Sequence, residues 1–503
     1  MSRREPKALT RADWICAALL TLIAAIPRLC CLGLAEFKLD EATHYQLAYQ
    51  LTHGAWQWVG STSSMGIPKP PLFVYALALP MTFSRDPRVI TGFLGVLAAL
   101  AAGGFYLILR RFLNRPAAFG SALLFALNPQ AVLYARKLFT ADLLPPLCTA
   151  FLGAATAFLR SPRERVGRWA LLTALTFALL LLNTLSPFLL VPALLALFWQ
   201  RRHDLSLSGW LGTGLALVLP FVPYLIHVIP TIPGVLTQAG ASSTQPSMLA
   251  WIWSLAYGAG YPDRWDRLPG LLALLTGGLY LGGLLWLIRA WRRPKDRSWA
   301  TFFIAWLGLA PLLGFILPID FKAHYLVVLY PLLFVLPGGA IELAYQRSRR
   351  AGWLLLTLVF VIGGWQAQNW RQTLAQVAAG VEGYGTPLHY WWRAAEEARN
   401  FAREHQAAEV LLVMPGDQPW DEKAHVLDAL LSDTPHRVIN GYSTLLYPPH
   451  TTLFLVASEV EQALTLLTPC SQQVGQPLEA SPFGGSYHYR FWEGDTLLTD
   501  DQP

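Results

Sequence analysis

The stretch from Val89 to Leu109, VITGFLGVLAALAAGGFYLIL, is 21 residues long and contains no charged side chain. A helix needs about 20 apolar residues to cross about 30 Å of hydrocarbon, so this stretch predicts a transmembrane helix. The whole chain of 503 residues has the same character, because 54% of it is hydrophobic and only 14% is charged. Soluble domains carry roughly 25% charged residues, so the composition excludes an ordinary soluble protein.

Ten further apolar segments resemble this one. We therefore expect a polytopic α-helical membrane protein with about 11 transmembrane helices. The fifth and sixth segments are short, and they form either one bent hairpin or two tilted spans. The segments are Trp14–Leu34, Val89–Leu109, Ala117–Tyr134, Leu143–Leu159, Trp169–Asn183, Ser186–Gln200, Trp210–Ile229, Leu268–Ile288, Trp299–Leu317, Tyr325–Leu343 and Gly352–Gln366.

Basic residues predict how these spans are oriented. Arg3, Arg4 and Lys7 precede the first span, which places the N-terminus in the cytoplasm. With alternating spans, the basic clusters then all fall on that same side: Arg110–Arg115, Arg160–Arg168, Arg201–Arg202, Arg289–Arg297 and Arg347–Arg350. The apolar stretch Pro71–Phe83 is too short to span, and we interpret it as an interfacial helix. We expect the chain to lie in the plasma (inner) membrane.

After Gln366 the pattern changes from membrane-spanning to globular. We place residues 1–367 in a transmembrane domain and residues 368–503 in a soluble extracytoplasmic α/β domain. From Tyr384 onward, 6 basic residues face 16 acidic ones. Helices and strands alternate there, which favours a small α/β fold. The expected elements are the helix Trp391–His405, the strand Glu409–Met414, the helix Glu422–Leu431, the strand Thr452–Ala457, the helix Glu459–Leu467 and the strand Tyr487–Trp492.

Two predicted outer loops, residues 35–88 and 230–267, are long, and long loops are candidates for function. The first contains Asp40-Glu41 and, later, Lys69 between prolines. These acids either carry chemistry or simply contact water. The second loop is rich in aromatic residues, which form either an interfacial belt or a sugar-stacking surface: Trp251, Trp253, Tyr257, Tyr261 and Trp265.

A third acid, Asp142, lies at the outer mouth of the fourth span, just before the Pro145-Pro146 pair. Its simplest role would be that of an N-cap for the following helix. Arg28, inside the first span, is expected to snorkel to the membrane surface rather than to bind a ligand.

The chain resembles the GT-C superfamily of polyprenyl-phosphate-sugar-dependent glycosyltransferases, which includes protein O-mannosyltransferases, lipid A aminoarabinose transferases and related bacterial enzymes. The resemblance rests on Asp-Glu-Ala with a nearby Tyr after the first span, Lys-Pro-Pro-Leu later in that loop, and Ala-Arg, Asp and Pro-Leu before the fourth span. It covers roughly residues 14 to 366.

The resemblance implies roles for individual residues. Asp40 would be the catalytic base and Asp142 would orient the acceptor or active-site cations, while Lys69 would contact the donor phosphate. Further candidates for substrate binding are Glu41, Tyr45, Arg136, Lys322, His324 and Tyr325. Pro68 stands where related aminoarabinose transferases carry Glu, so a metal site built on that Glu is in doubt. The metal ligands are unknown, and the sequence leaves open whether a divalent cation (Mg or Mn) is a cofactor.

The chemistry agrees with this interpretation. A sugar hydroxyl does not ionise freely, so a carboxylate must accept its proton as the new C–O bond forms. The departing phosphate gains negative charge and needs fixed cations. We expect a membrane glycosyltransferase that moves a sugar from a polyprenyl-phosphate-linked donor to a lipid, glycan or protein acceptor by inverting displacement.

Other function classes are less consistent with the chain. Membrane lipids are expected partners, and nucleic acid is not, because the cations lie in short clusters between apolar spans. A transporter or lipid flippase with an accessory outer domain is the alternative. It predicts polar residues near the middle of the membrane, whereas the acids here gather at one face.

Overall fold

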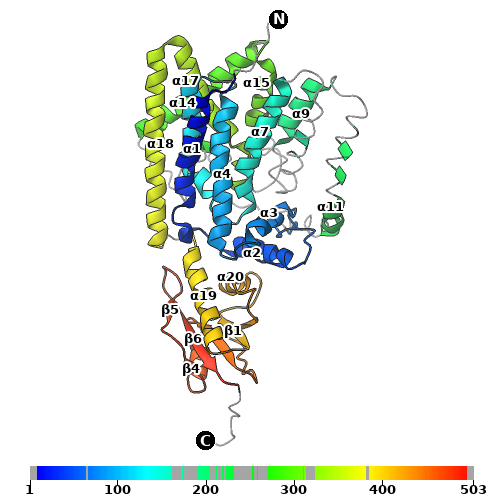
Figure 1. The fold of residues 1–503 in the computed structure, drawn as a ribbon, viewed down its shortest axis with the longest axis vertical. Helices are drawn as coiled ribbons and strands as arrows, with labels where there is room; N and C mark the ends of the chain where they lie inside the picture. The colour runs from blue at the N-terminus through cyan, green and yellow to red at the C-terminus, as the bar shows by residue number, and fades with distance from the viewer. Residues whose placement is uncertain are drawn as a thin grey trace, which may run out of the picture.

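The computed structural model describes residues 8–63, 66–160, 190–202, 222–231, 270–309, 323–380 and 384–494, with short pieces between residues 172 and 312. A bundle of helices forms the larger part, and a small α/β unit lies at one end of it (Figure 1). The main bundle helices are α1 (Arg11–Leu29), α4 (Pro87–Leu109), α5 (Arg115–Leu127), α7 (Leu144–Arg160), α9 (Val191–Arg201), α11 (Val222–Val228), α14 (Gly270–Arg292), α15 (Arg297–Ile304), α17 (Val335–Arg347) and α18 (Arg349–Ala378).

Five of the described helical segments are long and apolar enough to cross a membrane: Arg11–Leu29, Pro87–Leu109, Thr140–Leu159, Gly270–Arg292 and Arg349–Ala378. They correspond to the first, second, fourth, eighth and eleventh predicted spans. Most of the fifth span, the start of the sixth, parts of the seventh and the end of the ninth lie outside the described residues. The multi-span helical architecture is therefore confirmed, while the total of 11 spans stays a prediction.

The third and tenth predicted spans are interrupted at prolines. The third breaks after Leu127, because Pro129 starts a new short helix, α6 (Pro129–Leu133), whose N-cap Asn128 accepts a hydrogen bond from Ala131 N at 3.0 Å. The tenth begins as two 3-10 segments, Ala323–Leu329 and Leu332–Phe334, before α17. Proline removes a backbone donor and clashes with the preceding turn, and Pro331 lies between the two segments.

Ionic contacts bring the start of α1 to the end of α4. The carboxylate of Asp13 accepts hydrogen bonds from Arg110 Nε at 2.8 Å, Arg115 Nε at 3.1 Å and Tyr106 Oη at 3.0 Å. The hairpin between α17 and α18 lies at this same end of the bundle (Figure 1). The described basic clusters thus share one end, as predicted, and we name it the basic end.

Arg28 does not snorkel, which corrects the expectation from the sequence. Its guanidinium is fully buried and donates to Ala126 O at 2.6 Å and Ala24 O at 2.9 Å. The break at Asn128 leaves carbonyls at the end of α5 without helical donors, and Arg28 supplies them. Arg28 therefore joins α1 to α5.

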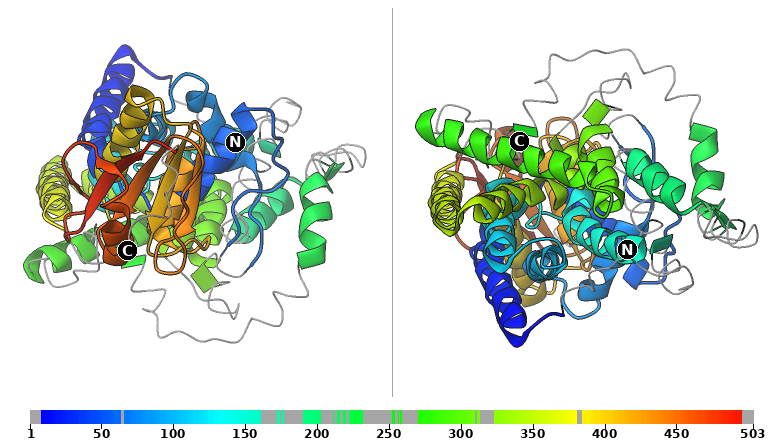
Figure 2. Two further views of the ribbon diagram at one scale, coloured as in Figure 1. Left: turned by 90° about the horizontal axis from the view of Figure 1, so that it is seen from below. Right: turned by 90° about the horizontal axis from the view of Figure 1, so that it is seen from above.

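At the opposite end of the bundle, two helices of the first predicted outer loop lie side by side: α2 (Leu39–Thr52) and α3 (Leu72–Met81) (Figures 1 and 2). Helix α3 is the short apolar helix predicted within Pro71–Phe83. It buries Phe73, Val74 and Leu77, so it packs on the protein instead of exposing a whole face.

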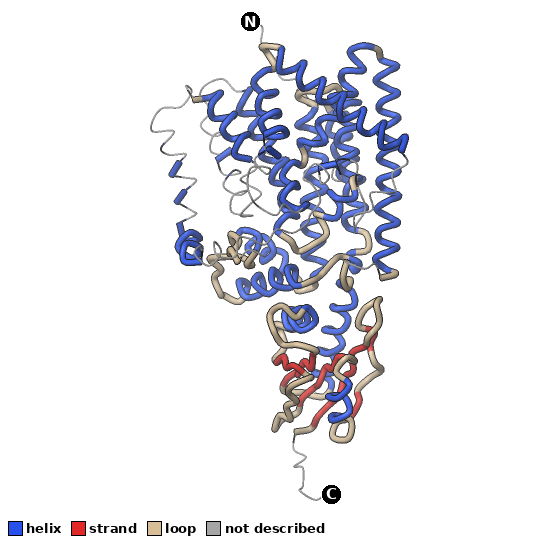
Figure 3. Tube along the Cα trace, turned by 180° about the vertical axis from the view of Figure 1, so that it is seen from behind, coloured by secondary structure: helices blue, strands red, loops and turns tan. Residues whose placement is uncertain are grey.

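The C-terminal unit is a mixed sheet with helices, shown with its strands in red in Figure 3. Its elements are α19 (Leu388–Glu404), β1 (Glu409–Met414), α20 (Glu422–Leu430), β2 (His436–Asn440), β3 (Thr452–Ala457), α21 (Glu461–Leu467), β4 (Gln472–Gln473), β5 (Leu478–Glu479) and β6 (Ser486–Trp492). The strand order is β2-β1-β3-β6-β4, with β5 also paired to β6. Strand β1 is parallel to β2 and β3, and β6 is antiparallel to β3.

All six elements predicted for this unit are present, while β2, β4 and β5 were not foreseen. These three strands are short or half exposed, so they lack a strong apolar pattern. Helix α18 continues to Ala378, past the predicted boundary at residues 367 and 368, which stays a prediction.

The C-terminal unit packs directly on the first loop. Leu388 N donates to Ala35 O at 3.0 Å, immediately before α2. Helix α20 contacts α2 through Thr43 Oγ1 and His425 Nε2 at 2.9 Å, and through Gln46 Nε2 and Asp428 Oδ2 at 2.9 Å. Helix α2 is thus held between the bundle and the C-terminal unit.

Candidate active site

Asp40 and Glu41 lie in the first turn of α2. The side chain of Glu41 reaches back to accept a hydrogen bond from Lys38 N at 3.0 Å, which defines where the helix begins. Carboxylates are favourable at this position because the helix dipole is positive at its N-terminus. Glu41 is buried, whereas Asp40 is exposed and forms no ion pair with any described residue. The fold therefore leaves the carboxylate of Asp40 accessible to a ligand.

Lys69 is held beside these carboxylates by its own backbone. Lys69 N donates to Ser61 O at 2.9 Å, and Gly60 N donates to Lys69 O at 2.6 Å. Burial lowers the pKa of Lys69, and the negative charges of Asp40 and Glu41 act in the opposite direction. The ammonium group makes no ion pair with the residues that the structure describes, and it lies over the ring of Phe139 at 5.1 Å from the centroid.

The ring of Phe139 joins three distant parts of the chain. Lys69 comes from the first outer loop, and the imidazole of His44 from α2 meets the same ring edge-on at 6.3 Å. His324, which precedes the tenth predicted span, meets it edge-on at 5.0 Å. The first outer loop, the loop that contains Phe139 and the segment before the tenth predicted span therefore meet at one place.

His44 is a neutral, buried member of this group. Its Nε2 lies 2.8 Å from Ser61 Oγ, and its ring packs edge-on against Phe73 at 5.0 Å. Burial and the nearby charge of Lys69 hold the pKa of His44 well below its usual value. His44 thus supports the loop segment that leads to Lys69.

The loop that precedes α7 contributes Lys137 and Asp142. The carboxylate of Asp142 is fully buried and accepts a hydrogen bond from Lys137 N at 2.7 Å, so it closes the loop that precedes α7. Its other oxygen, Oδ1, has no hydrogen-bond partner among the described residues. In the described contacts Asp142 therefore acts within its own loop and does not cap the following helix.

An ion-pair chain links this loop to the end of α1. Glu36 pairs with Lys137 and with Lys38, the latter at 2.8 Å. Burial alone would raise the pKa of Glu36, but the two lysine charges lower it. Burial would likewise lower the pKa of Lys137, while the carboxylates of Glu36 and Glu41 raise it well above its usual value.

Burial makes Glu41 a carboxyl group that ionises less readily than usual. Burial and the negative charges of Glu36 and Asp40 raise the pKa of Glu41 to about 7. Its side chain is almost completely enclosed, at 4% exposure. The cluster thus combines one accessible carboxylate, Asp40, with one buried carboxyl that holds a proton close to neutral pH.

The remaining predicted residues have other surroundings. The hydroxyl of Tyr45 donates to Arg85 O at 2.8 Å, away from the carboxylates. Tyr325 is buried next to His324, with ring centroids 4.2 Å apart. Lys322 lies outside the described residues, as do Trp251, Tyr257, Tyr261 and Trp265 of the second long loop.

Arg136 is buried, and its guanidinium is hydrogen-bonded to backbone carbonyls. Its guanidinium donates to Pro27 O at 2.8 Å and Cys31 O at 2.8 Å, and also to Cys30 O. These carbonyls lie in and just after the last turn of α1, so Arg136 stabilises the end of that helix. Its described contacts support a structural role instead of substrate contact.

Sequence reasoning missed His44, Glu36 and Phe139. His44 follows Asp40 by four residues, which places both on one face of a helix, and this spacing could have revealed it. Glu36 and Phe139 carry no such signal, because their partners come from other loops. Within the described parts of the chain, no group of three or more His, Cys, Asp or Glu residues is arranged to hold a metal ion.

One known protein family matches part of this sequence. The sequence model of the dolichyl-phosphate-mannose-protein mannosyltransferase family matches residues 68–227, which include Lys69 and Asp142. No curated protein sequence matches the chain.

The fold is similar to several solved structures. ArnT from Cupriavidus metallidurans bound to undecaprenyl phosphate matches with a TM-score of 0.54 and 14% identity over 95% of this chain and 98% of that one. The apo state of the same ArnT matches with a TM-score of 0.52 and 13% identity, over 94% of this chain and 97% of that one. The arabinofuranosyltransferase AftD from Mycobacteria matches with a TM-score of 0.54 and 16% identity over 100% of this chain but 41% of that one. The predicted resemblance to GT-C glycosyltransferases is confirmed, and at these identities the structural matches establish the shared fold.

Proposed function

We propose that this protein is a membrane glycosyltransferase of the GT-C type that takes its sugar from a polyprenyl-phosphate-linked donor. The observation that carries the proposal is that Lys69 and His44 of the first outer loop meet His324, which precedes the tenth predicted span, at the ring of Phe139. Asp40 lies on the same helix as His44, four residues earlier. The fold shared with ArnT, which was solved with undecaprenyl phosphate, supports the choice of donor.

Asp40 is the proposed general base. As the acceptor hydroxyl oxygen attacks the anomeric carbon, its proton passes to the carboxylate of Asp40. The bond between the anomeric carbon and the phosphate oxygen breaks, and its electron pair leaves with the polyprenyl phosphate. One displacement of this kind inverts the anomeric configuration. Asp40 suits this task because its carboxylate is exposed and has no ion-pair partner among the described residues.

Lys69 is the proposed cation for the leaving phosphate. Lys69 as a whole is only 8% exposed, and its ammonium lies against an aromatic ring, where the attraction for a phosphate is stronger than in water. Two backbone hydrogen bonds hold the residue in place before any ligand arrives. Such preorganised charge stabilises a transition state without reorganisation at the moment of reaction.

The outer loops are proposed to face the extracytoplasmic side. The basic clusters lie at the other end of the bundle, and basic residues favour the cytoplasmic side. The acceptor would then be a lipid, glycan or protein outside the cytoplasm, and the C-terminal unit would lie on that same side. Asp142, Glu41 and Tyr325 are proposed to shape the site around the reacting groups.

A transfer assay with purified full-length protein tests this function. Labelled sugars on undecaprenyl phosphate are supplied together with a cell-envelope acceptor fraction, and labelled product is measured. Asp40→Asn should lower the transfer rate by roughly 100-fold or more, since general-base catalysis contributes 10²- to 10⁴-fold. Glu404→Gln, which changes an exposed acid of the C-terminal unit, is the matched control and should transfer normally.

Full activity of a correctly folded Asp40→Asn variant would remove Asp40 from the mechanism. Transport of a solute into proteoliposomes without any lipid-linked sugar, combined with no transfer from any donor, would contradict the proposed function itself.

A further inference from the structure

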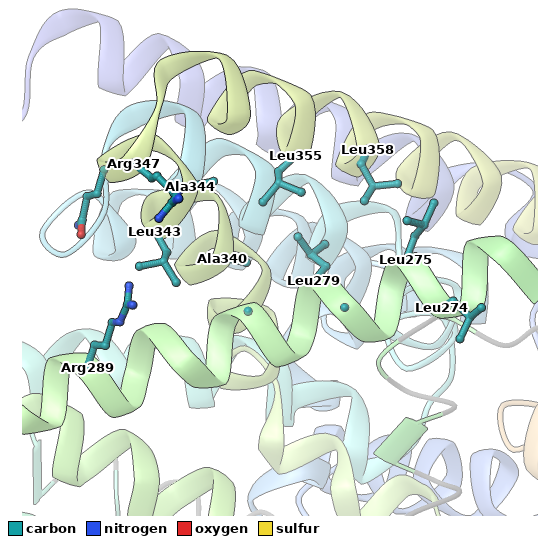
Figure 4. A pocket seen from close by; sticks show the side chains of 13 residues that line it. Leu274, Leu275, Leu279, Arg289, Ala340, Leu343, Ala344, Arg347, Leu355 and Leu358 are labelled. Carbon is teal, nitrogen blue, oxygen red and sulfur yellow. The ribbon is translucent and has the colours of Figure 1, made fainter.

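A groove of about 620 Å³ lies between α14, α17 and α18, close to the basic end of the bundle (Figure 4). This volume is in the range of small-molecule binding sites. Helix α2, which carries Asp40, lies at the opposite end of the bundle from the hairpin between α17 and α18 that borders the groove (Figure 1). The groove is therefore distinct from the proposed transfer site.

The groove is open because small residues lie along it, and leucines form its walls. Gly278 and Gly282 of α14 and Ala340 and Ala344 of α17 lie along the groove. Figure 4 shows Leu275 and Leu279 of α14 facing Leu355 and Leu358 of α18 across it. The long part of the groove thus offers only apolar contact.

One end of the groove is cationic. Arg289, in the last turn of α14, and Arg347, the last residue of α17, both line it, together with Gln346 (Figure 4). Neither arginine forms an ion pair with any residue that the structure describes, and both are exposed. The groove therefore has an apolar length and two uncompensated positive charges at one end.

Its length matches one leaflet of a bilayer. Leu274 and Arg289 are 15 residues apart on α14, which corresponds to about 22 Å at about 1.5 Å per residue. Half of the hydrocarbon core is about 15 Å thick, so the groove reaches from the headgroup region to about the midplane. Leu274 is 75% exposed, so the groove opens sideways, where lipid chains can enter.

We propose that this groove binds one anionic glycerophospholipid from the leaflet at the basic end. Its acyl chains would lie along the leucines, and its phosphate would lie between Arg289 and Arg347. Basic pockets between transmembrane helices bind anionic headgroups in this way. A zwitterionic lipid would fill the apolar length equally well but would gain much less from the two arginines.

Native mass spectrometry of the full-length protein tests the proposal. The protein is extracted from mixed phosphatidylglycerol and phosphatidylcholine bilayers, and retained lipid is counted. Wild-type protein should retain phosphatidylglycerol in preference to phosphatidylcholine. Arg289→Ala combined with Arg347→Ala should weaken this binding about 25-fold, since each cation near the surface contributes roughly fivefold. Arg292→Ala combined with Arg350→Ala is the matched control, because these arginines do not line the groove.

A second variant fills the groove without disturbing the packing. A Cβ atom added at Gly278 would meet no atom within 4 Å, so Gly278→Leu should fold normally, with its side chain in the open groove where it excludes the lipid chain. Gly364→Leu, at a similarly open position of α18, is its control and should retain the lipid.

Equal retention of both lipids, or retention unaffected by both Gly278→Leu and the double arginine variant, would overturn the proposal. Displacement of the phospholipid by undecaprenyl phosphate at equal concentration would also overturn it, because the groove would then belong to the carrier lipid.

Discussion

Glu41 and Asp40 are neighbours in the first turn of α2, but the fold treats their carboxyl groups differently. Asp40 faces outward, while Glu41 is buried and its pKa is raised to about 7 by burial and the charges of Glu36 and Asp40. An acid whose pKa is raised by folding stabilises the protein fully below its unfolded pKa. That contribution is lost as the pH rises through the folded pKa.

Stability should therefore fall between about pH 4.5 and pH 7 because of Glu41, by an amount on the order of 3 kcal/mol. Glu41→Gln removes the titration and keeps an oxygen that can accept from Lys38 N. We expect the melting temperature of wild type to decline relative to this variant between pH 5 and pH 7.5. If the melting temperatures of the two proteins changed in parallel with pH across this range, the raised pKa of Glu41 would be contradicted.

The sequence identified single candidate residues where these residues belong to a recognisable motif. Asp40 and Lys69 were selected as candidates, and the structure brings them together. Glu36 and Arg28 were not understood, because their partners come from other loops and from a helix break. Hydropathy records that Arg28 lies in an apolar segment, but it cannot show that the carbonyls of Ala24 and Ala126 satisfy its guanidinium there.

At the scale of elements, α14 and α17 pack so closely that only glycine fits at the contact. A Cβ atom at Gly283 would lie 2.1 Å from the carbonyl oxygen of Leu336. Gly283→Ala should therefore push the two helices apart and destabilise the protein by roughly 1–3 kcal/mol or more. Thermal unfolding of the purified protein measures this change.

Gly104→Ala in α4 is the comparison, because an added Cβ there would meet no atom within 4 Å. It should be neutral or stabilise by roughly 0.5–1 kcal/mol, since alanine favours helix more than glycine does. If both variants melted at the same temperature, the close contact between α14 and α17 would be wrong.

The elements predicted best are those whose pattern depends on their own residues. Helix α4 and helix α14 are continuous apolar runs, and α19 shows a clear amphipathic pattern. The helix breaks in the third and tenth predicted spans were not foreseen, because a hydropathy pattern does not register where proline interrupts a helix. Pro129 and Pro331 decide the geometry there, although the segments remain apolar throughout.

At the scale of the whole molecule, the C-terminal unit holds α2 against the bundle. His425 and Asp428 of α20 contact Thr43 and Gln46 on α2, and Leu388 N binds Ala35 O just before it. A displacement of about 1 Å in a catalytic group can cost about 100-fold in rate. We therefore propose that this unit positions Asp40.

The combination His425→Ala and Asp428→Ala removes both side-chain contacts without changing α2. We expect transfer to fall at least tenfold while the protein stays folded, as judged by its melting curve. His436→Ala is the control, because it removes the other partner of Asp428 inside the C-terminal unit and leaves the contacts to α2 in place. Unchanged transfer in the double variant would show that the unit does not position Asp40.

The charge pattern predicted the arrangement of the molecule better than any motif. Basic residues gather at the end of the bundle where α1 begins, and the acidic C-terminal unit lies at the other end, beside α2 (Figure 1). The close packing of that unit on the first loop could not be foreseen, because it depends on single hydrogen bonds between residues about 380 positions apart.

The central claim is that the outer loops form one site for the phosphate of a polyprenyl carrier. A cryo-EM structure of the full-length protein with undecaprenyl phosphate tests it most directly, with Lys69→Met as the matched variant. We predict the phosphate within about 4 Å of Lys69 Nζ, near Asp40, in wild type and a weakened or absent phosphate in the variant. A well-ordered phosphate bound elsewhere on the molecule, or the same position in both proteins, would contradict the account.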